Sequence, residues 1–211
     1  EKWREVVGTG RITHGVLVPT VLYRLLDLQK ANPRDFSSLT TLVYGAAPMS
    51  PTKLGELVEC FGQIFCQGYA ATEAAMFIAV LDKADHRSDS EAAIRHLSSA
   101  GRITPGVEVF ISDENGNQLP FGETGEIRIR CKAIIKGYYG NPEATASEFE
   151  NGAWKSGDLG YIDSDGYLYI VDRMKDMIIS GGFNLFPSEI ERVLFGHPAV
   201  QDCAVVGMPD E

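Results

Sequence analysis

The spacing of hydrophobic residues changes along this chain, and the change limits the folds that the chain can adopt. Up to about residue 81, apolar runs typical of buried strands alternate with helical patterns, as in HGVLVPT followed by PTVLYRLLDLQK. From Gly101 onward, GVEVFIS and GEIRIRC alternate apolar and polar residues, with Asn115-Gly116 as a turn signal between them. The first pattern predicts an α/β layer with a mostly parallel sheet, and the second predicts an antiparallel β subdomain, a small barrel.

A third pattern begins after Arg173. A short strand in DMIIS, the loop GGFN, a helix opened by Pro187-Ser188 and a strand in DCAVVGM indicate the beginning of a small α+β domain. We therefore expect residues 1–100 to form the α/β part of a large domain, 101–172 its β subdomain, and 173–211 the start of the small domain. Both ends of the chain adjoin structured patterns, so we expect a fragment of a longer protein.

The charge balance narrows the classes of partner. Acidic residues outnumber basic ones 29 to 19, giving a formal net charge of −10, and no long Lys/Arg stripe is present, so no nucleic acid partner is expected. The sequence contains no run of about 18 apolar residues, the length that a transmembrane helix needs. The chain opens on Glu-Lys-Trp-Arg without an apolar targeting segment, and we expect a cytoplasmic protein. The four cysteines lack CxxC spacing and are interpreted as reduced thiols without a metal or disulfide role.

Two small-residue stretches each allow a functional and a structural interpretation. In GYAATEAA, Tyr69 offers a stacking face for a base and Glu73 a carboxylate for a metal, but a loop that enters a helix capped by Thr72 explains the same letters. In YGAAP, small residues let a backbone approach a flat ligand, or they mark a tight turn between a strand and a helix.

Three polar features further along the chain are also ambiguous when taken singly. Asp158 in SGDLG either accepts hydrogen bonds from two hydroxyl groups or holds an Asx turn. Arg173 either pairs with an anion or lies on the surface. The fragment DSDG lacks the remaining ligands of a calcium loop, so a hairpin turn is favoured there over calcium binding.

The order of these features is more specific than any one of them. YGAAP, GYAATE, GEIRIRCKAIIKGYYGNPEAT and WKSGDLGYIDSDGYLYIVDRMKDMIISGGFNLFPSEIE, between residues 43 and 191, together resemble the adenylate-forming superfamily of acyl-CoA synthetases, non-ribosomal adenylation domains and luciferases. ITHGVLVPTVLYRLL extends the resemblance to nearly the whole chain. Within the superfamily, VYGAAPMS and ISGGFNLFPSEIE are most similar to fatty-acyl-CoA and aryl-CoA ligases.

The resemblance implies a nucleotide site in the first half of the chain. Gly45, Ala46 and Ala47 match the loop beside the adenine, and Tyr69 matches the aromatic residue that stacks on it. Thr72 matches a residue that touches the α-phosphate and is expected to be catalytic.

Other matched positions imply the ribose contact, the metal and the acyl pocket. Glu73 matches the magnesium-binding glutamate, and His14 matches the gate residue next to the acyl pocket, so both are also expected in the catalytic set. Asp158 matches the acceptor of the ribose hydroxyls and Arg173 its basic companion, which places both in the AMP/ATP-binding set.

The last matched positions imply a hinge between the two domains and a channel for the thiol. Lys175 falls at the hinge between the two domains, and Gly181 and Gly182 match the loop that lines the thiol channel. Two departures are mild: Ala70 stands where the family commonly has glycine, and Ser156 replaces a frequent threonine.

The resemblance implies an enzyme, an acid–thiol ligase that uses ATP, Mg²⁺ and CoA. A carboxylic acid would form an acyl-adenylate, and the thiol of CoA would then take the acyl group. The family's phosphate loop and its catalytic lysine are not in the sequence, so we expect the fragment alone to be inactive. Two alternatives stay open: an enzyme that loads a carrier protein instead of CoA, and a non-catalytic nucleotide-binding module.

Overall fold

The computed structural model describes residues 2–47, 49–195, 197, 199–200 and 203–208. It divides into two compact units: unit 1 comprises residues 1–72 and 76–104, and unit 2 comprises residues 73–75 and 105–211. Each unit is described by itself. No helix among the described residues is long and apolar enough to cross a membrane. The division near residue 104 lies close to the change in hydrophobic spacing, while the three-part domain division stays a prediction.

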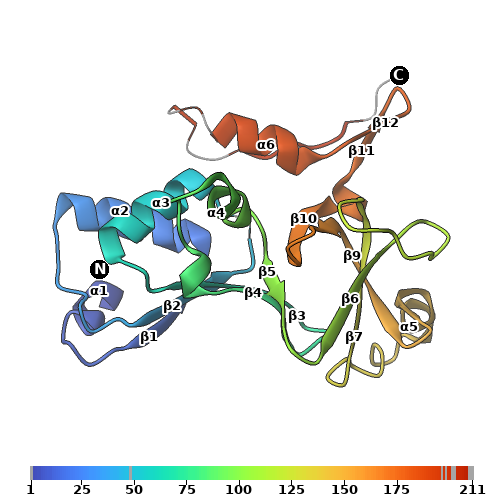
Figure 1. Ribbon diagram of the computed structural model, residues 1–211, viewed down its shortest axis with the longest axis horizontal. Helices are drawn as coiled ribbons and strands as arrows, with labels where there is room; N and C mark the ends of the chain where they lie inside the picture. The colour runs from blue at the N-terminus through green and yellow to red at the C-terminus, as the bar shows by residue number, and fades with distance from the viewer. Residues whose placement is uncertain (1, 48, 196, 198, 201–202, 209–211) are drawn as a thin grey trace. The chain divides into compact units, whose positions relative to one another are not determined.

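Unit 1 is an α/β layer. Its elements in chain order are α1 (Lys2–Val7), β1 (His14–Leu17), α2 (Pro19–Ala31), β2 (Thr41–Gly45), α3 (Pro51–Phe61), β3 (Phe65–Ala71), β4 (Met76–Leu81), the 3-10 helix η1 (Lys83–Asp85), α4 (Glu91–His96) and β5 (Gly101–Ile103). The strands lie side by side in the order β1-β2-β3-β4-β5 (Figure 1). The predicted α/β layer is confirmed.

The sheet of unit 1 is mixed, which corrects the expectation of a mostly parallel sheet. The pairs β1–β2 and β2–β3 are parallel, whereas β3–β4 and β4–β5 are antiparallel. The reason is the short turn Thr72–Ala75 between β3 and β4. A parallel return needs a crossover of a dozen or more residues, so this turn forces the antiparallel pairing.

The two long helices of unit 1 begin where the local sequence places their caps. Pro19 opens α2, where its missing N–H loses no hydrogen bond. Ser50 caps α3 by accepting a hydrogen bond from the backbone N–H of Lys53 at 3.5 Å. The apolar faces of the helices and strands bury a single core: Val7, Leu22, Leu25, Leu26, Phe36, Leu39, Leu42, Tyr44, Met49, Leu54, Leu57, Phe65 and Leu97.

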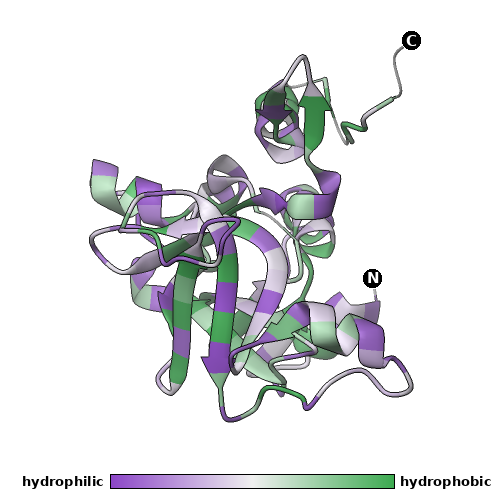
Figure 2. Cartoon of the chain, turned by 90° about the vertical axis from the view of Figure 1, so that its right-hand side faces the viewer, coloured by the Kyte–Doolittle hydropathy of each residue, from purple (hydrophilic) through white to green (hydrophobic). Residues whose placement is uncertain are grey.

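Unit 2 is built mainly from antiparallel strands. Its elements are β6 (Val107–Ser112), β7 (Gly125–Cys131), α5 (Pro142–Glu148), β8 (Phe149–Glu150), β9 (Ala153–Ile162), β10 (Tyr167–Arg173), the 3-10 helix η2 (Met174–Asp176), β11 (Ile178–Ser180), β12 (Phe183–Leu185) and α6 (Pro187–Phe195). The large strands follow the order β10-β9-β7-β6, and β8 pairs with β9. Hydrophobic and hydrophilic residues alternate along the strands that face the viewer in Figure 2.

The strands of unit 2 form an open row and not the small barrel expected from the sequence. Closure would require the first and last strands of the row to pair with each other, and among the described residues β6 pairs with β7 and not with β10. The antiparallel pairing itself is confirmed. Ile127, Ile129 and Leu168 on these strands are fully buried.

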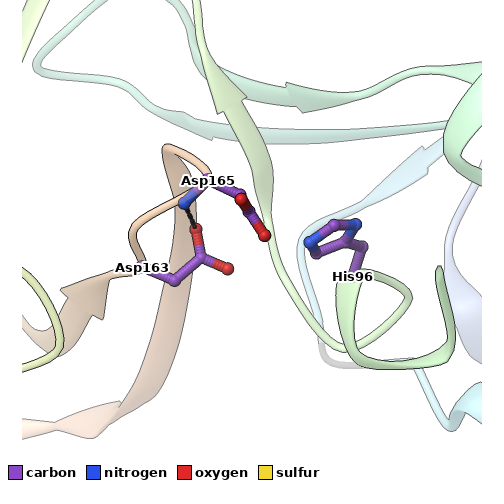
Figure 3. A group of neighbouring side chains, drawn as sticks. All are labelled: His96, Asp163 and Asp165. Carbon is purple, nitrogen blue, oxygen red and sulfur yellow. Dashed lines mark hydrogen bonds between the residues drawn. The ribbon is translucent and has the colours of Figure 1, made fainter. Parts of the chain in front are cut away.

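The DSDG segment forms the turn between β9 and β10. One carboxylate oxygen of Asp163 accepts a hydrogen bond from the backbone N–H of Asp165 at 3.0 Å (Figure 3). The same oxygen accepts a second bond from the backbone N–H of Tyr167 at 2.9 Å. Gly166 takes a φ of +81°, which glycine adopts without strain. The Asp163 side chain therefore stabilises the turn, in agreement with the hairpin turn that the sequence favoured over calcium binding.

The end of the chain differs from the expectation in two places. Gly181 and Gly182 join two strands, β11 and β12, and not a strand and a helix. Residues 203–208 form no strand, and residue 202 lies outside the described residues. The backbone N–H of Val205 donates instead to Glu191 Oε1 in α6, at 2.9 Å.

Candidate functional site

The carboxyl ends of β2 and β3 bring two of the predicted segments together in unit 1. The two strands are parallel, with Gly45 opposite Gly68, so the residues that follow each strand leave the sheet at the same edge. A Cβ atom on Gly45 would lie 2.3 Å from the carbonyl oxygen of Gly68. Residue 45 therefore has to be glycine, because any side chain would collide with the neighbouring backbone.

The residues beyond this glycine are open to solvent. Ala46 and Ala47 are exposed, and Ala46 has a φ of +66°, which is uncommon for a residue with a side chain. Tyr69, one residue after Gly68, is partly buried, and Thr72 is exposed. Ligands of open α/β sheets bind outside the carboxyl ends of the strands, so this edge is the expected place for a flat ligand.

Thr72 does not cap a helix. It begins the turn that joins the antiparallel strands β3 and β4, in which Ala71 lies opposite Met76. The structural alternative from the sequence, a loop that enters a helix, is therefore wrong. The turn places the Thr72 hydroxyl at an exposed position beyond the end of β3.

His14 lies at the other end of these strands. It is the first residue of β1 and pairs with Thr41, the first residue of β2. Gly45 is four residue steps along the strand from Thr41, a rise of about 13 Å at roughly 3.3 Å per residue. The His14 side chain is exposed and its Nδ1 atom lies 2.8 Å from the hydroxyl of Thr13. The structure does not bring His14 together with the Gly45 loop.

Glu73 is held by residues of unit 2 at two points. Its backbone carbonyl accepts a hydrogen bond from the N–H of Ile135 at 2.9 Å. Its side-chain Oε1 accepts one from the hydroxyl of Tyr138, also at 2.9 Å. Glu73 is partly buried, so a carboxylate oxygen, the ligand type that Mg²⁺ prefers, stands in a fixed position. Sequence reasoning missed Tyr138, although the letters KGYYG lie inside one of the matched motifs.

Asp158 and Arg173 form an ion pair across β9 and β10. They lie opposite each other in the strand register, and Arg173 Nε donates to Asp158 Oδ1 at 3.1 Å. The Asp158 side chain is 9% exposed, while that of Arg173 is 58% exposed. The arginine thus fixes a nearly buried carboxylate from the solvent side. The structure thus brings these two predicted site residues together.

Ser156 holds the backbone of Asp158. Its hydroxyl donates to the carbonyl of Ile127 at 2.7 Å and accepts from the backbone N–H of Asp158 at 3.1 Å. A hydroxyl side chain is sufficient for both bonds, which explains why serine can stand where the family often has threonine.

The hinge and channel positions lie further along unit 2. Lys175 is exposed in the 3-10 helix η2, between β10 and β11. Gly181 and Gly182 have φ values of +58° and +82° and form the tight turn of the β11–β12 hairpin. Such a turn favours glycine at both central positions, so the hairpin explains the two glycines without any ligand.

Two family models match this chain. Residues 1–139 match the family described as AMP-binding enzyme, and residues 189–211 match the AMP-binding enzyme C-terminal domain. The chain belongs to the AMP-binding enzyme family. The resemblance to adenylate-forming enzymes, based on four motifs, is thereby confirmed.

Named relatives and solved structures agree with this assignment. The chain is 45% identical over 206 residues to the medium/long-chain-fatty-acid–CoA ligase FadD8 of Mycobacterium tuberculosis, covering 98% of this chain and 35% of the relative. It matches the amide bond synthetase McbA from Marinactinospora thermotolerans with a TM-score of 0.89 and 38% identity, over 99% of this chain and 42% of that one.

A third match carries a nucleotide. O-succinylbenzoate coenzyme A synthetase (MenE) from Bacillus subtilis, in complex with ATP and magnesium ion, matches with a TM-score of 0.85 and 32% identity, over 100% of this chain and 42% of that one. This chain thus spans well under half the length of the proteins that it matches.

Proposed function

We propose that this chain is the AMP-binding part of an ATP-dependent acid–thiol ligase, which joins a carboxylic acid to CoA through an acyl-adenylate. The main support is the common edge of β2 and β3, where the Gly45 loop and the Tyr69–Thr72 segment follow adjacent parallel strands. In this proposal Gly45, Ala46 and Ala47 pass beside the adenine, and the Tyr69 ring stacks on it.

The proposed ribose contact uses the fixed carboxylate of unit 2. A carboxylate accepts hydrogen bonds from both ribose hydroxyls, and such charge-assisted bonds are stronger than neutral ones. The ion pair with Arg173 at 3.1 Å keeps the Asp158 side chain oriented. His14 has no part in this proposal, because it lies at the opposite end of the strands from the Gly45 loop.

In the first half-reaction, a carboxylate oxygen of the acid attacks the α-phosphorus of ATP. A new O–P bond forms and the bond to pyrophosphate breaks, so the enzyme has to position the phosphate and neutralise charge. The exposed hydroxyl of Thr72 is available to donate to an α-phosphate oxygen. Glu73 supplies an oxygen ligand for Mg²⁺, and the ion, when bound, neutralises charge on the phosphates.

In the second half-reaction, the thiol sulfur attacks the acyl carbonyl, the thiol loses its proton and AMP leaves. The β11–β12 turn presents two residues without side chains, and nothing lies within 4 Å of the positions where their Cβ atoms would be. We propose that this open turn lines the path of the thiol after the small domain rotates about Lys175.

We propose CoA as the acyl acceptor, since FadD8 and MenE both carry CoA ligation in their names. A carrier protein is the alternative acceptor. The complete protein that contains this chain would be offered free CoA or a phosphopantetheinylated carrier protein with the same acid and ATP. Faster acyl transfer to the carrier would overturn the CoA assignment.

Titration with AMP tests the nucleotide site. In the complete protein, Asp158→Ala is expected to weaken AMP binding by at least about 1.5–3 kcal/mol, the value of one hydrogen bond to a charged group. Asp27→Ala removes the same charge from an exposed position on α2 and is expected to leave AMP binding unchanged. Equal AMP affinity of the Asp158→Ala variant and the unaltered protein, both folded, would exclude the ribose contact.

A further inference from the structure

Tyr138 connects Glu73 to a second glutamate of unit 2. The Tyr138 hydroxyl oxygen lies 2.9 Å from Glu73 Oε1 and 2.5 Å from Glu148 Oε2. Tyr138 belongs to the loop between β7 and α5, and Glu148 is the last residue of α5. The hydroxyl therefore spans two carboxylates that are 75 positions apart in the sequence, between residues 73 and 148.

Tyr138 itself is fixed at its backbone and at its ring. Its N–H donates to the Thr145 hydroxyl at 2.9 Å, and its ring packs edge-on against Phe149 at a centroid distance of 5.7 Å. A Cβ atom on the preceding residue, Gly137, would lie 2.4 Å from Thr145 Cγ2, so a glycine there lets the loop lie close to α5. The position of the hydroxyl is thus determined by contacts that do not involve Glu73.

The hydroxyl has one proton for two acceptors. Both partner atoms are carboxylate oxygens, which only accept, so the hydroxyl is the donor and shares its proton between them. No other described residue bonds to the Glu73 carboxylate, so Tyr138 is the contact that limits its rotation.

We propose that Tyr138 is a positioning residue for the metal-binding carboxylate: its hydroxyl holds Glu73 Oε1 and leaves Oε2 for the cation, while Thr145 and Phe149 hold Tyr138. This inference rests on the proposed function, in which Glu73 is a ligand of Mg²⁺. Without the hydroxyl, the Glu73 side chain has to be ordered when the ion binds. Loss of an outer-shell partner of a metal ligand typically costs about 10–100-fold in metal affinity or activity.

Direct metal binding gives the first test. The complete protein would be titrated with Mn²⁺ in the presence of α,β-methylene-ATP, with free Mn²⁺ measured by electron paramagnetic resonance. Tyr138→Phe keeps the ring against Phe149 and is expected to raise the Kd for Mn²⁺ about 10-fold. Tyr139→Phe is the matched control, because Tyr139 is the next residue and is fully exposed. It is expected to leave the Kd unchanged.

The reference variant Glu73→Gln separates the metal role of Glu73 from the positioning role of Tyr138. If Glu73→Gln weakens Mn²⁺ binding and Tyr138→Phe does not, the positioning role is overturned and the proposed function stands. If Glu73→Gln has no effect on Mn²⁺ binding, the metal role of Glu73 is overturned, and the positioning role falls with it.

The Mg²⁺ dependence of ATP–pyrophosphate exchange gives a second readout, which a purely structural role would not produce. Tyr138→Phe is expected to raise the Mg²⁺ concentration for half-maximal exchange and to recover the full rate at saturating Mg²⁺. A rate that stays low at every Mg²⁺ concentration would overturn the inference. If Tyr138→Phe does not fold, Glu148→Leu leaves the hydroxyl proton to Glu73 alone. Mn²⁺ binding should then be kept or strengthened, and weaker Mn²⁺ binding in that folded variant would equally overturn the inference.

Discussion

Replacing Tyr44 by phenylalanine tests the buried hydrogen bond behind the Gly45 loop. Tyr44 and His86 are each 1% exposed, and the Tyr44 hydroxyl oxygen lies 3.0 Å from His86 Nε2. His86 Nδ1 lies 2.7 Å from the carbonyl oxygen of Asp82, which can only accept, so Nδ1 carries the proton. The Tyr44 hydroxyl is therefore the donor and Nε2 the acceptor.

The expected loss follows from the environment of the acceptor. Tyr44→Phe leaves Nε2 buried without a donor, which costs about 1–3 kcal/mol. The phenylalanine ring keeps the edge contacts with His86, at 5.7 Å, and with Phe65, at 6.4 Å, so little packing is lost. The ratio of folded to unfolded unit 1 should fall about 5- to 150-fold. With an m-value of about 2 kcal/mol per M, the urea midpoint should fall by about 0.5–1.5 M.

Tryptophan fluorescence can follow unit 1 by itself. The chain has two tryptophans, Trp3 in unit 1 and Trp154 in unit 2. The buried indole N–H of Trp154 has no hydrogen-bond partner in the part of the chain that the structure describes, so Trp154→Phe breaks no hydrogen bond. In that background Trp3, which packs edge-on against Phe36 at 5.9 Å, reports the unfolding of unit 1 in urea.

A double-mutant cycle decides whether the hydrogen bond causes the loss. The double variant Tyr44→Phe/His86→Phe removes both polar partners of this hydrogen bond. The Asp82 carbonyl then loses its bond to His86 Nδ1, but Asp82 is exposed to water. The double variant should therefore lose less stability than the sum of the two single variants. An unchanged midpoint for Tyr44→Phe, or losses that simply add, would refute this account of the buried pair.

Two further predictions concern pH and the β11–β12 turn. Burial lowers the pKa of His86 below its ordinary value of about 6.5, so the unfolded chain binds more protons in the range below that pH. The urea midpoint of unit 1 is expected to fall as the pH drops below about 6.5, and a His86→Phe variant with the same pH dependence would contradict this. Gly182→Leu is expected to slow thioester formation while acyl-adenylate still accumulates in single turnovers of the complete protein. Equal loss in both steps would instead indicate that the leucine, at a φ of +82°, merely strains the hairpin.

Elements set by nearby residues were predictable from the sequence. Pro19 and Ser50 mark the starts of α2 and α3, and Asp163 with Gly166 marks the β9–β10 turn, because each signal acts within four positions of itself. The direction of β4 was not predictable from its apolar run, since such a run is buried in either direction. The turn Thr72–Ala75 decides the direction of β4, and the sequence of this turn was equally compatible with a helix capped by Thr72.

The candidate site shows the same limit. The resemblance supplied Asp158 and Arg173, and the strand register explains how they meet across β9 and β10. It also supplied Glu73, but not the tyrosine that holds it. Residues 73 and 138 are 65 positions apart, and the letters around Tyr138 describe only a glycine-rich loop. A contact of that range depends on the packing of α5 and β8, which no local pattern encodes.

Residues 73–75 group with residues 105–211, although the segments on both sides of them in the sequence belong to unit 1. For recombination between relatives this means that residue 104 is a poor crossover point. A hybrid joined there would take Glu73 from one parent, and Ile135, Tyr138 and Glu148 from the other. Parents that differ at Tyr138 or Glu148 would then yield a hybrid whose carboxylate has lost its partner, even where each half folds as it did before.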